Sequence, residues 1–328
     1  MAKFLMPLSL LLLLMSFAAM SEGQLGFGFY SQTCPSAESI VRSVVSDAVR
    51  ASANAAAVLL RLHFHDCYVD GCDGSILIDN GPRSEKLAFG HQGVGGFEII
   101  ERAKQAVEAE CPGVVSCADI VAMAARDAIV LANGPEYEVE TGRRDGRVSE
   151  ISHADDLPDV GDSVQVLKDK FAQKGMTDKD LVLLSAAHTI GTTACFFMTK
   201  RLYNFSPGGS GSDPDISPAL LPELKSQCPP NGDVSTRLAI DRGSQQSFDI
   251  HILQNIRNGF AVLASDARLN DDASTRAVMD SYFSPLTPIF GPSFQDDFVN
   301  SMVRMGQIGV KSGSQGEIRR VCSSFNSR

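Results

Sequence analysis

One stretch of the chain, from Arg61 to Cys67, combines a permanent cation, imidazoles and a carboxylate among apolar residues. Arg61 and His65 are four residues apart and so share one face of a predicted helix, whereas His63 and His65 point to nearly opposite sides. Arg61 and His65 together offer a base that takes a proton and a fixed charge that stabilises the resulting anion, as splitting a peroxide would require. A partly buried, ion-paired helix is the alternative interpretation of these residues.

A further histidine, His188, stands at the end of an apolar run that begins at Leu181. A lone histidine in such a setting is often a core residue whose ring nitrogens are satisfied by neighbours. It would equally suit an axial haem ligand, which needs a neutral imidazole facing an apolar pocket and an acceptor for its other nitrogen. The residues alone leave both interpretations open.

The ten residues from Asp66 to Ser75 gather hard oxygen donors and glycines, a composition that suits Ca²⁺. Their spacing is not that of an EF-hand loop, and a solvated turn rich in Asp and Gly is the alternative. Cys67 and Cys72 lie within the segment, and a short disulfide between them would hold its backbone carbonyls inward. We therefore keep calcium as a hypothesis for this loop.

Most of the chain has the apolar spacing of α-helices, which predicts a mostly α-helical protein. A chain of 328 residues exceeds the usual size of one core, so two lobes with a cleft between them are expected. The stretch from Ser206 to Asp241 is rich in Pro, Gly, Ser and Asp and predicts an irregular surface excursion. Helices are predicted over residues 36–56, 97–110, 117–132, 163–174, 177–187, 192–203, 247–264 and 293–310.

The compartment is indicated by a leader and by the cysteines. Residues 1–23 carry Lys3 and an apolar run before small residues, which predicts a secretory signal peptide. Eight cysteines indicate disulfides, with ~105 possible pairings, and no CxxC pair supports zinc. The sequon at Asn204 predicts a glycan on a secreted protein.

The net charge of −10 disfavours nucleic acid as a partner, and no second apolar stretch predicts a membrane span.

Several further motifs occur in the order found in one family, and with them the chain resembles the class III secretory plant haem peroxidases. The resemblance covers roughly residues 24 to 325, so we expect residues 24–328 to form a single haem peroxidase domain. The matching motifs are Gln24-Leu25, Phe29-Tyr30, Thr33-Cys34-Pro35, the block from Arg61 to Asp73, Val115-Ser116-Cys117-Ala118-Asp119, Gly142-Arg143-Arg144-Asp145 and Ser185 with His188-Thr189.

The resemblance implies a two-lobed fold with one haem b between the lobes, H₂O₂ as substrate and small phenolic donors, in a monomer of the cell wall or apoplast. His65 resembles the acid/base on the distal side of the haem, with Arg61 as its fixed charge and Phe64 as an aromatic wall. His188 resembles the iron ligand, and Asp266 the carboxylate that hydrogen-bonds its other nitrogen. Pro158 would line the donor entrance, near which Phe89 and Phe197 are either donor contacts or core residues.

The resemblance also implies structural sites. Asp119 and Arg143 would form a buried, structural ion pair. Four disulfides would join Cys34 to Cys111, Cys67 to Cys72, Cys117 to Cys322, and Cys195 to Cys228. Two Ca²⁺ sites would use Asp66, Val69, Gly71, Asp73 and Ser75 on the distal side, and Thr189, Asp241, Ser244, Ser247 and Asp249 on the proximal side.

One residue departs from the family pattern. Where the family has an asparagine that accepts a hydrogen bond from the distal histidine, this chain has His91, while Glu85, which helps hold that residue, is present. A neutral His91 still accepts the bond, but an imidazole also takes up a proton in mildly acidic solution. A second hypothesis is therefore a haem- and calcium-binding wall protein with weak turnover, and a third is a calcium-binding protein without haem.

Overall fold

The structure, a computed structural model, describes residues 25–231, 235–285, 287 and 291–327, so the predicted signal peptide and Gln24 lie outside the described residues. Helices are the main regular structure of the described chain, with two short strands, as predicted. Its α-helices are α2 (Ala37–Ala51), α3 (Asn54–Cys67), α4 (Phe97–Glu110), α5 (Cys117–Leu131), α6 (Val164–Gln173), α7 (Asp178–Ser185), α8 (Cys195–Tyr203), α9 (Leu221–Gln227), α10 (His251–Arg257), α11 (Ala264–Arg268), α12 (Ala273–Ser281) and α14 (Phe294–Met305). Short 3₁₀ helices include η1 (Ser75–Leu77), η2 (Gly81–Arg83), η3 (Glu85–Leu87), η4 (Phe89–His91), η5 (Ile151–Ala154) and η6 (Ala186–Thr189), and two strands are β1 (Thr192–Ala194) and β2 (Arg237–Ala239).

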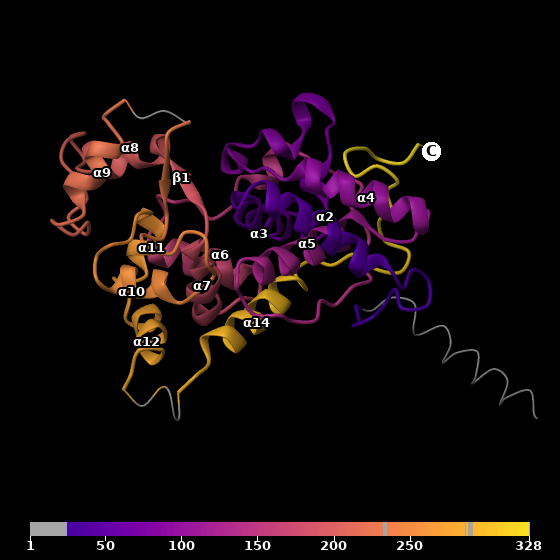
Figure 1. The fold of residues 1–328 in the computed structure, drawn as a ribbon. Helices are drawn as coiled ribbons and strands as arrows, with labels where there is room; N and C mark the ends of the chain where they lie inside the picture. The colour runs from indigo at the N-terminus through magenta and orange to yellow at the C-terminus, as the bar shows by residue number, and fades with distance from the viewer. Residues whose placement is uncertain (1–24, 232–234, 286, 288–290, 328) are drawn as a thin grey trace, which may run out of the picture.

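The helices gather on two sides of the molecule (Figure 1). Helices α2 to α5 form one side, where α3 packs against α5, and α2 packs against α4 and α5. Helices α8 to α12 form the other side, and α7 packs against both α12 and α14. This arrangement agrees with the predicted two lobes.

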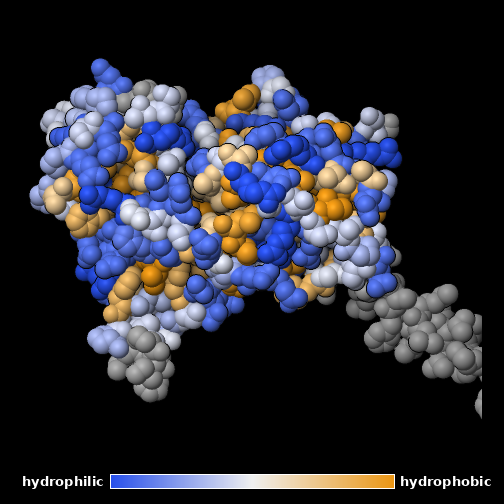
Figure 2. All heavy atoms as spheres, viewed as in Figure 1, coloured by the Kyte–Doolittle hydropathy of each residue, from blue (hydrophilic) through white to orange (hydrophobic). Residues whose placement is uncertain are grey.

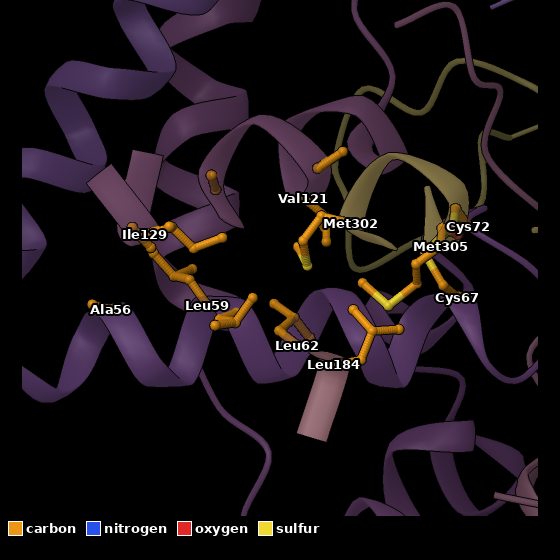
Figure 3. Close-up of a cluster of buried hydrophobic side chains, with 14 of the residues drawn as sticks. Ala56, Leu59, Leu62, Cys67, Cys72, Val121, Ile129, Leu184, Met302 and Met305 are labelled. Atoms are coloured by element: carbon orange, nitrogen blue, oxygen red, sulfur yellow. Dashed lines mark hydrogen bonds between the residues drawn. A yellow bond between two sulfur atoms is a disulfide. The ribbon is translucent and has the colours of Figure 1, made fainter. Parts of the chain in front are cut away.

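The buried apolar side chains form two clusters. The larger one contains the interface between α3 and α5, where Leu59 and Leu62 of α3 meet Val121 and Ile129 of α5 (Figure 3). The smaller cluster joins α8, α9 and β2. Its members are Cys195, Met198, Leu202, Ile216, Leu220, Leu224, Cys228, Leu238 and Val262.

All four disulfide pairings implied by the family resemblance are confirmed, and the described residues contain no free cysteine. The bridges join Cys34 to Cys111, Cys67 to Cys72, Cys117 to Cys322, and Cys195 to Cys228.

Some element boundaries predicted from the sequence were wrong. The helix predicted over 36–56 is two helices, because Ser52 takes an extended conformation (φ −153°) and ends α2. The helix predicted over 192–203 begins only at Cys195, since residues 192–194 pair with β2 in antiparallel register. The helix predicted over 247–264 is limited to α10, and α9, α11, α12 and β2 were not predicted.

The surface is mixed in character. On the face drawn in Figure 2, polar side chains cover most of the molecule and apolar atoms are scattered among them, including a group between the two sides. In the described part of the chain, every helix is too short or too polar to cross a membrane.

A buried carboxylate ties the N-terminal segment to the loop after α5. Asp119, at the start of α5, accepts hydrogen bonds from the Tyr30 hydroxyl (2.6 Å), the Gly142 amide (2.7 Å) and Arg143 Nη1 (2.9 Å). Asp119 and Arg143 are both buried. The geometry fits the structural role that we predicted for this ion pair, because removing one partner strands the other as a buried charge.

We expect Asp119→Ala to lower the free energy of unfolding by about 3–5 kcal/mol, because it leaves the Arg143 guanidinium buried without a counter-charge. Urea unfolding of the oxidised protein, followed by far-UV circular dichroism, measures the change. Asp47→Ala, which removes one partner of an exposed pair with Arg50, is the control and should have little effect. Equal stabilities of the two variants would contradict a structural role for Asp119.

Candidate active site

Helix α3 presents Arg61, Phe64 and His65 next to one another, as the four-residue spacing predicted. His65 is buried, and the edge of its ring meets the Phe64 ring at a centroid distance of 5.6 Å. Arg61 Nη2 donates to the Gln92 carbonyl (3.1 Å). No carboxylate of the described residues lies within ion-pair distance of Arg61, so the alternative of an ion-paired helix is wrong for this arginine. Its charge is available to a ligand.

His63 faces the opposite side of α3. Its Nδ1 lies 3.6 Å from Cys67 Sγ, and it borders the same small space as Arg143. Burial, assisted by the charge of Arg143, lowers the pKa of His63 to about 3. His63 is therefore a neutral core residue, which leaves His65 as the imidazole that shares a face with Arg61.

His91 lies where the family resemblance puts it, beside His65. The two Nδ1 atoms are 2.9 Å apart, and His91 Nε2 lies 3.3 Å from Glu85 Oε1, with the side chains of His91 and Glu85 both fully buried. Only one Nδ1 can carry the shared proton. If the Glu85 carboxylate accepts from His91 Nε2–H, then His91 Nδ1 is the acceptor, His65 Nδ1 is the donor, and His65 Nε2 is left as a free base.

The surroundings keep His65 unprotonated. Burial lowers its pKa well below the ordinary value, and the charges of Arg61, His91 and His188 lower the pKa further. Burial also raises the pKa of Glu85, although His91 opposes that shift. A neutral imidazole with one free nitrogen is the form that accepts a proton from a substrate.

His188 is anchored by Asp266, as predicted. Its Nδ1 lies 2.9 Å from Asp266 Oδ1, and the exposed fraction is 39% for the His188 side chain against 1% for Asp266. Burial by itself would lower the pKa of His188, but the Asp266 carboxylate raises it above the ordinary value. The interpretation of His188 as a satisfied core histidine is therefore wrong. An imidazole with one nitrogen bound to a carboxylate and the other unpartnered fits an axial ligand of haem iron.

The segment after His188 comes close to α3. Gly191 has φ +100°, and a Cβ at this position would fall only 2.6 Å from the Ala57 Cβ, so a larger residue would separate the two segments. Helix η6, which carries His188, also contacts α3. These contacts place His188 near enough to His65 for the charge of His188 to lower the pKa of His65.

The predicted distal calcium residues converge around buried oxygen atoms. Asp66 Oδ1 and Ser75 Oγ are buried and have no hydrogen-bond partner among the described residues. Burial, and next the charge of Asp73, raise the pKa of Asp66 well above its ordinary value, which indicates two carboxylates that repel each other. Val69 lies in the same loop. Gly71 packs closely on the backbone of Gly309, since a Cβ at Gly71 would fall 2.6 Å from a Gly309 backbone atom. Unsatisfied hard oxygens beside two carboxylates fit a Ca²⁺ ion.

The predicted proximal calcium residues also lie together. Thr189 Oγ1 donates to Asp241 Oδ2 (2.9 Å) and lies 3.3 Å from Asp249 Oδ1. The Ser244 hydroxyl donates to the Asp249 carboxylate and lies 3.3 Å from the Ser247 carbonyl. No three acidic, histidine or cysteine side chains of the described residues form a metal cluster, so a metal ion in either loop would need hydroxyl and carbonyl oxygens as ligands as well.

Some neighbours of these loops were not predicted. Lys174 Nζ donates to the Val69 carbonyl (2.7 Å), Lys311 contacts the Asp73 carboxylate, and His251 Nδ1 lies 3.0 Å from Asp241 Oδ1. Lys174 and Lys311 are more than a hundred residues from the loop that they touch, so no local spacing could reveal them. His251 follows Asp249 by two residues, and that proximity was the one available signal.

The other predicted residues are those of the donor entrance and the glycan site. Leu157, the neighbour of Pro158, packs on the η4 turn, since a Cβ at Gly90 would fall 3.0 Å from Leu157 Cδ1. Phe89 is 65% exposed and is therefore not a core residue, whereas Phe197 is half-buried. Asn204 is exposed just after α8, where a glycan can be attached, and the glycan stays a prediction.

Comparison with known proteins gives a consistent result. Residues 41–284 match the family model described as Peroxidase. The chain is 64% identical over 325 residues to Peroxidase 43 of Arabidopsis thaliana, covering 99% of this chain and 98% of that protein. It is 55% identical to Peroxidase 13 of Arabidopsis thaliana (93% and 94% covered) and 50% identical to Peroxidase N1 of Nicotiana tabacum (91% and 90% covered).

Proposed function

The chain belongs to the peroxidase family, and from this premise we propose how its own residues reduce H₂O₂ and oxidise small phenolic donors. The observation that carries the proposal is the placement of two anchored histidines: His65, tied to His91 and beside Arg61, and His188, tied to Asp266. When bound, one haem b supplies the iron that exchanges electrons with peroxide and donors. His188 Nε2 would hold that iron, and Asp266 would accept its Nδ1–H and make the imidazole a stronger donor.

In this proposal His65 moves one proton. Its free Nε2 accepts a proton from the near oxygen of H₂O₂ and delivers it to the far oxygen, which leaves as water. The Arg61 guanidinium stabilises the negative charge that develops as the O–O bond breaks. Two phenol molecules each supply one electron and one proton, so one H₂O₂ yields two water molecules and two phenoxyl radicals. Pro158 and the exposed Phe89 would guide the donors.

We further propose that residues 1–23 direct secretion, that the protein works in the cell wall or apoplast, and that it binds two Ca²⁺ ions. Phenolic cross-linking, lignification and peroxide removal in the response to oxidative stress are the roles that this chemistry would serve. The relatives, each named a peroxidase, favour an enzyme over a wall protein with disabled turnover.

Stopped-flow absorbance of the secreted, haem-loaded protein tests the function. On mixing with stoichiometric H₂O₂, we expect the Soret band to fall rapidly and to recover when a phenol is added. Arg61→Leu should slow the first phase by roughly 10²-fold or more, because the stabilising charge is lost. A Soret band that hardly responds to H₂O₂ would contradict the proposal and favour a haem-binding wall protein.

His91 should make the reaction with H₂O₂ depend on pH. Burial raises the pKa of Glu85, and a protonated Glu85 would donate to His91 Nε2 and leave the His91 proton on Nδ1. His65 would then have to present Nδ1 as the acceptor and carry its proton on Nε2, where it no longer acts as a base. We therefore expect the reaction with H₂O₂ to slow as the pH falls from 8 to 5, and His91→Asn to remove most of this loss. The lowered pKa of His65 keeps that residue neutral in the asparagine variant over this range.

The rate of the first Soret phase from pH 5 to 8 is the measurement. His153→Asn, which changes an exposed histidine paired with Asp70, is the control and should keep the pH dependence of the parent protein. Identical profiles for the parent and His91→Asn would contradict this role of His91.

Removal of calcium should disturb both histidine segments. Because Asp66 follows His65 and Thr189 follows His188, we propose that Ca²⁺ positions the two histidine segments and takes no part in proton transfer. Removal by a chelator should lower the melting temperature by several degrees, shift the Soret band and reduce activity. Re-added Ca²⁺ should restore all three, and Mg²⁺, which demands tighter octahedral geometry, should not. An unchanged Soret band and activity after complete removal would rule out this positioning role.

A further inference from the structure

Arg237 stands at the edge of the candidate active site, and the mechanism proposed above does not use it. It lies on β2 and is paired across the sheet with Ala194 of β1, the strand that begins four residues after His188. Its side chain is fixed by Thr192, which accepts from Nε through Oγ1 (3.1 Å) and from Nη2 through the carbonyl (3.1 Å). Arg237 is nevertheless exposed.

These two bonds leave one end of the guanidinium available. A guanidinium has five N–H donors, of which Nε–H and one Nη2–H are used. The second Nη2–H and both Nη1–H groups have no partner among the described residues. One N–H on each terminal nitrogen is the arrangement that receives a carboxylate through two parallel hydrogen bonds.

Arg237 and Arg61 also lack a counter-charge. Most other arginines of the described chain pair with an Asp or Glu, as Arg143 does with Asp119, but no carboxylate of the described residues lies within ion-pair distance of Arg61 or Arg237. Burial lowers the pKa of Arg61 to about 10, and the charge of Arg237 is the second cause of this shift. The two guanidinium groups are therefore close enough to repel each other. In a chain of net charge −10, an uncompensated pair of cations at this site attracts an anion.

We propose that Arg237 binds a carboxylate at the rim of the active site, in the positive field that it shares with Arg61. This rests on the proposed haem peroxidase function. Two carboxylates can reach the rim: a propionate of the haem, or the acid group of a hydroxycinnamic donor. The haem propionate is favoured, because β1 continues directly from the segment that carries His188, and a fixed carboxylate suits a guanidinium that is itself fixed.

The test compares Arg237→Leu, Arg237→Lys and the parent as holoenzymes. The rate of haem transfer to excess apomyoglobin, followed by Soret absorbance, should rise about tenfold or more in Arg237→Leu and less in Arg237→Lys, which keeps the charge but not the paired donors. With haem dimethyl ester, which has no free propionate, the parent and Arg237→Leu should lose the cofactor at equal rates. Arg276→Leu is the control, since Arg276 is exposed and its one hydrogen-bond partner among the described residues is the Asn270 carbonyl.

A second arm identifies the source of the carboxylate. If the donor supplies it, Arg237→Leu raises KM for p-hydroxycinnamic acid about tenfold, leaves KM for its methyl ester unchanged and does not change haem loss. Either outcome supports a carboxylate site. Equal haem loss and equal KM values for the parent and both Arg237 variants would overturn it. Failure of the peroxidase function is distinguishable, because the parent itself would then show no Soret response to H₂O₂.

Discussion

The rotation of α3 about its own axis is the constraint on which the rest of the site depends. Leu59 and Leu62 pack against α5 and set that rotation, and the same packing buries His63 on the core side. With those positions fixed, a period of 3.6 residues brings Arg61 and His65 to the opposite face. One residue further, Asp66 stands in the last turn of α3 and begins the proposed calcium loop, which contains the Cys67–Cys72 bridge. One helix orientation thus places the core side chains, the Arg61 and His65 face and the start of the proposed calcium loop.

Charge is distributed unevenly in this acidic protein. Buried cations outside the site are neutralised where they lie: Arg143 by Asp119, and Arg201 by Asp213. Such pairs are expected, because a lone buried charge is costly. Arg61 departs from this pattern, and its lowered pKa records the cost of burial and of repulsion by Arg237. A fixed positive charge kept without a protein partner is what stabilisation of a developing anion requires.

The sequence was sufficient to predict those features that depend on local periodicity or on a family pattern. The bounds of α4 were predicted to the residue, and α5 to within one, because their apolar residues repeat at helical spacing between clear stop signals. The disulfides and the pairing of His188 with Asp266 came from the family resemblance. Arg237 was missed because strand β2 has three residues, and its pairing with β1 bridges more than forty positions of chain. Lys174 and Lys311 were also missed, because each lies more than a hundred residues from the loop that it contacts.

Replacing an amide by the His91 imidazole changes how proton positions are determined in the distal site. An amide carbonyl is an acceptor in every protonation state of its neighbours, whereas an imidazole nitrogen is an acceptor in one tautomer only. The tautomer of His91 depends on Glu85, because a carboxylate beside Nε2 favours a proton there and leaves Nδ1 free to accept from His65. A neutral Glu85 could instead donate to His91 Nε2, which would move the His91 proton to Nδ1 and reverse both hydrogen bonds. The burial that raises the pKa of Glu85 therefore bears directly on which nitrogen of His65 is the base.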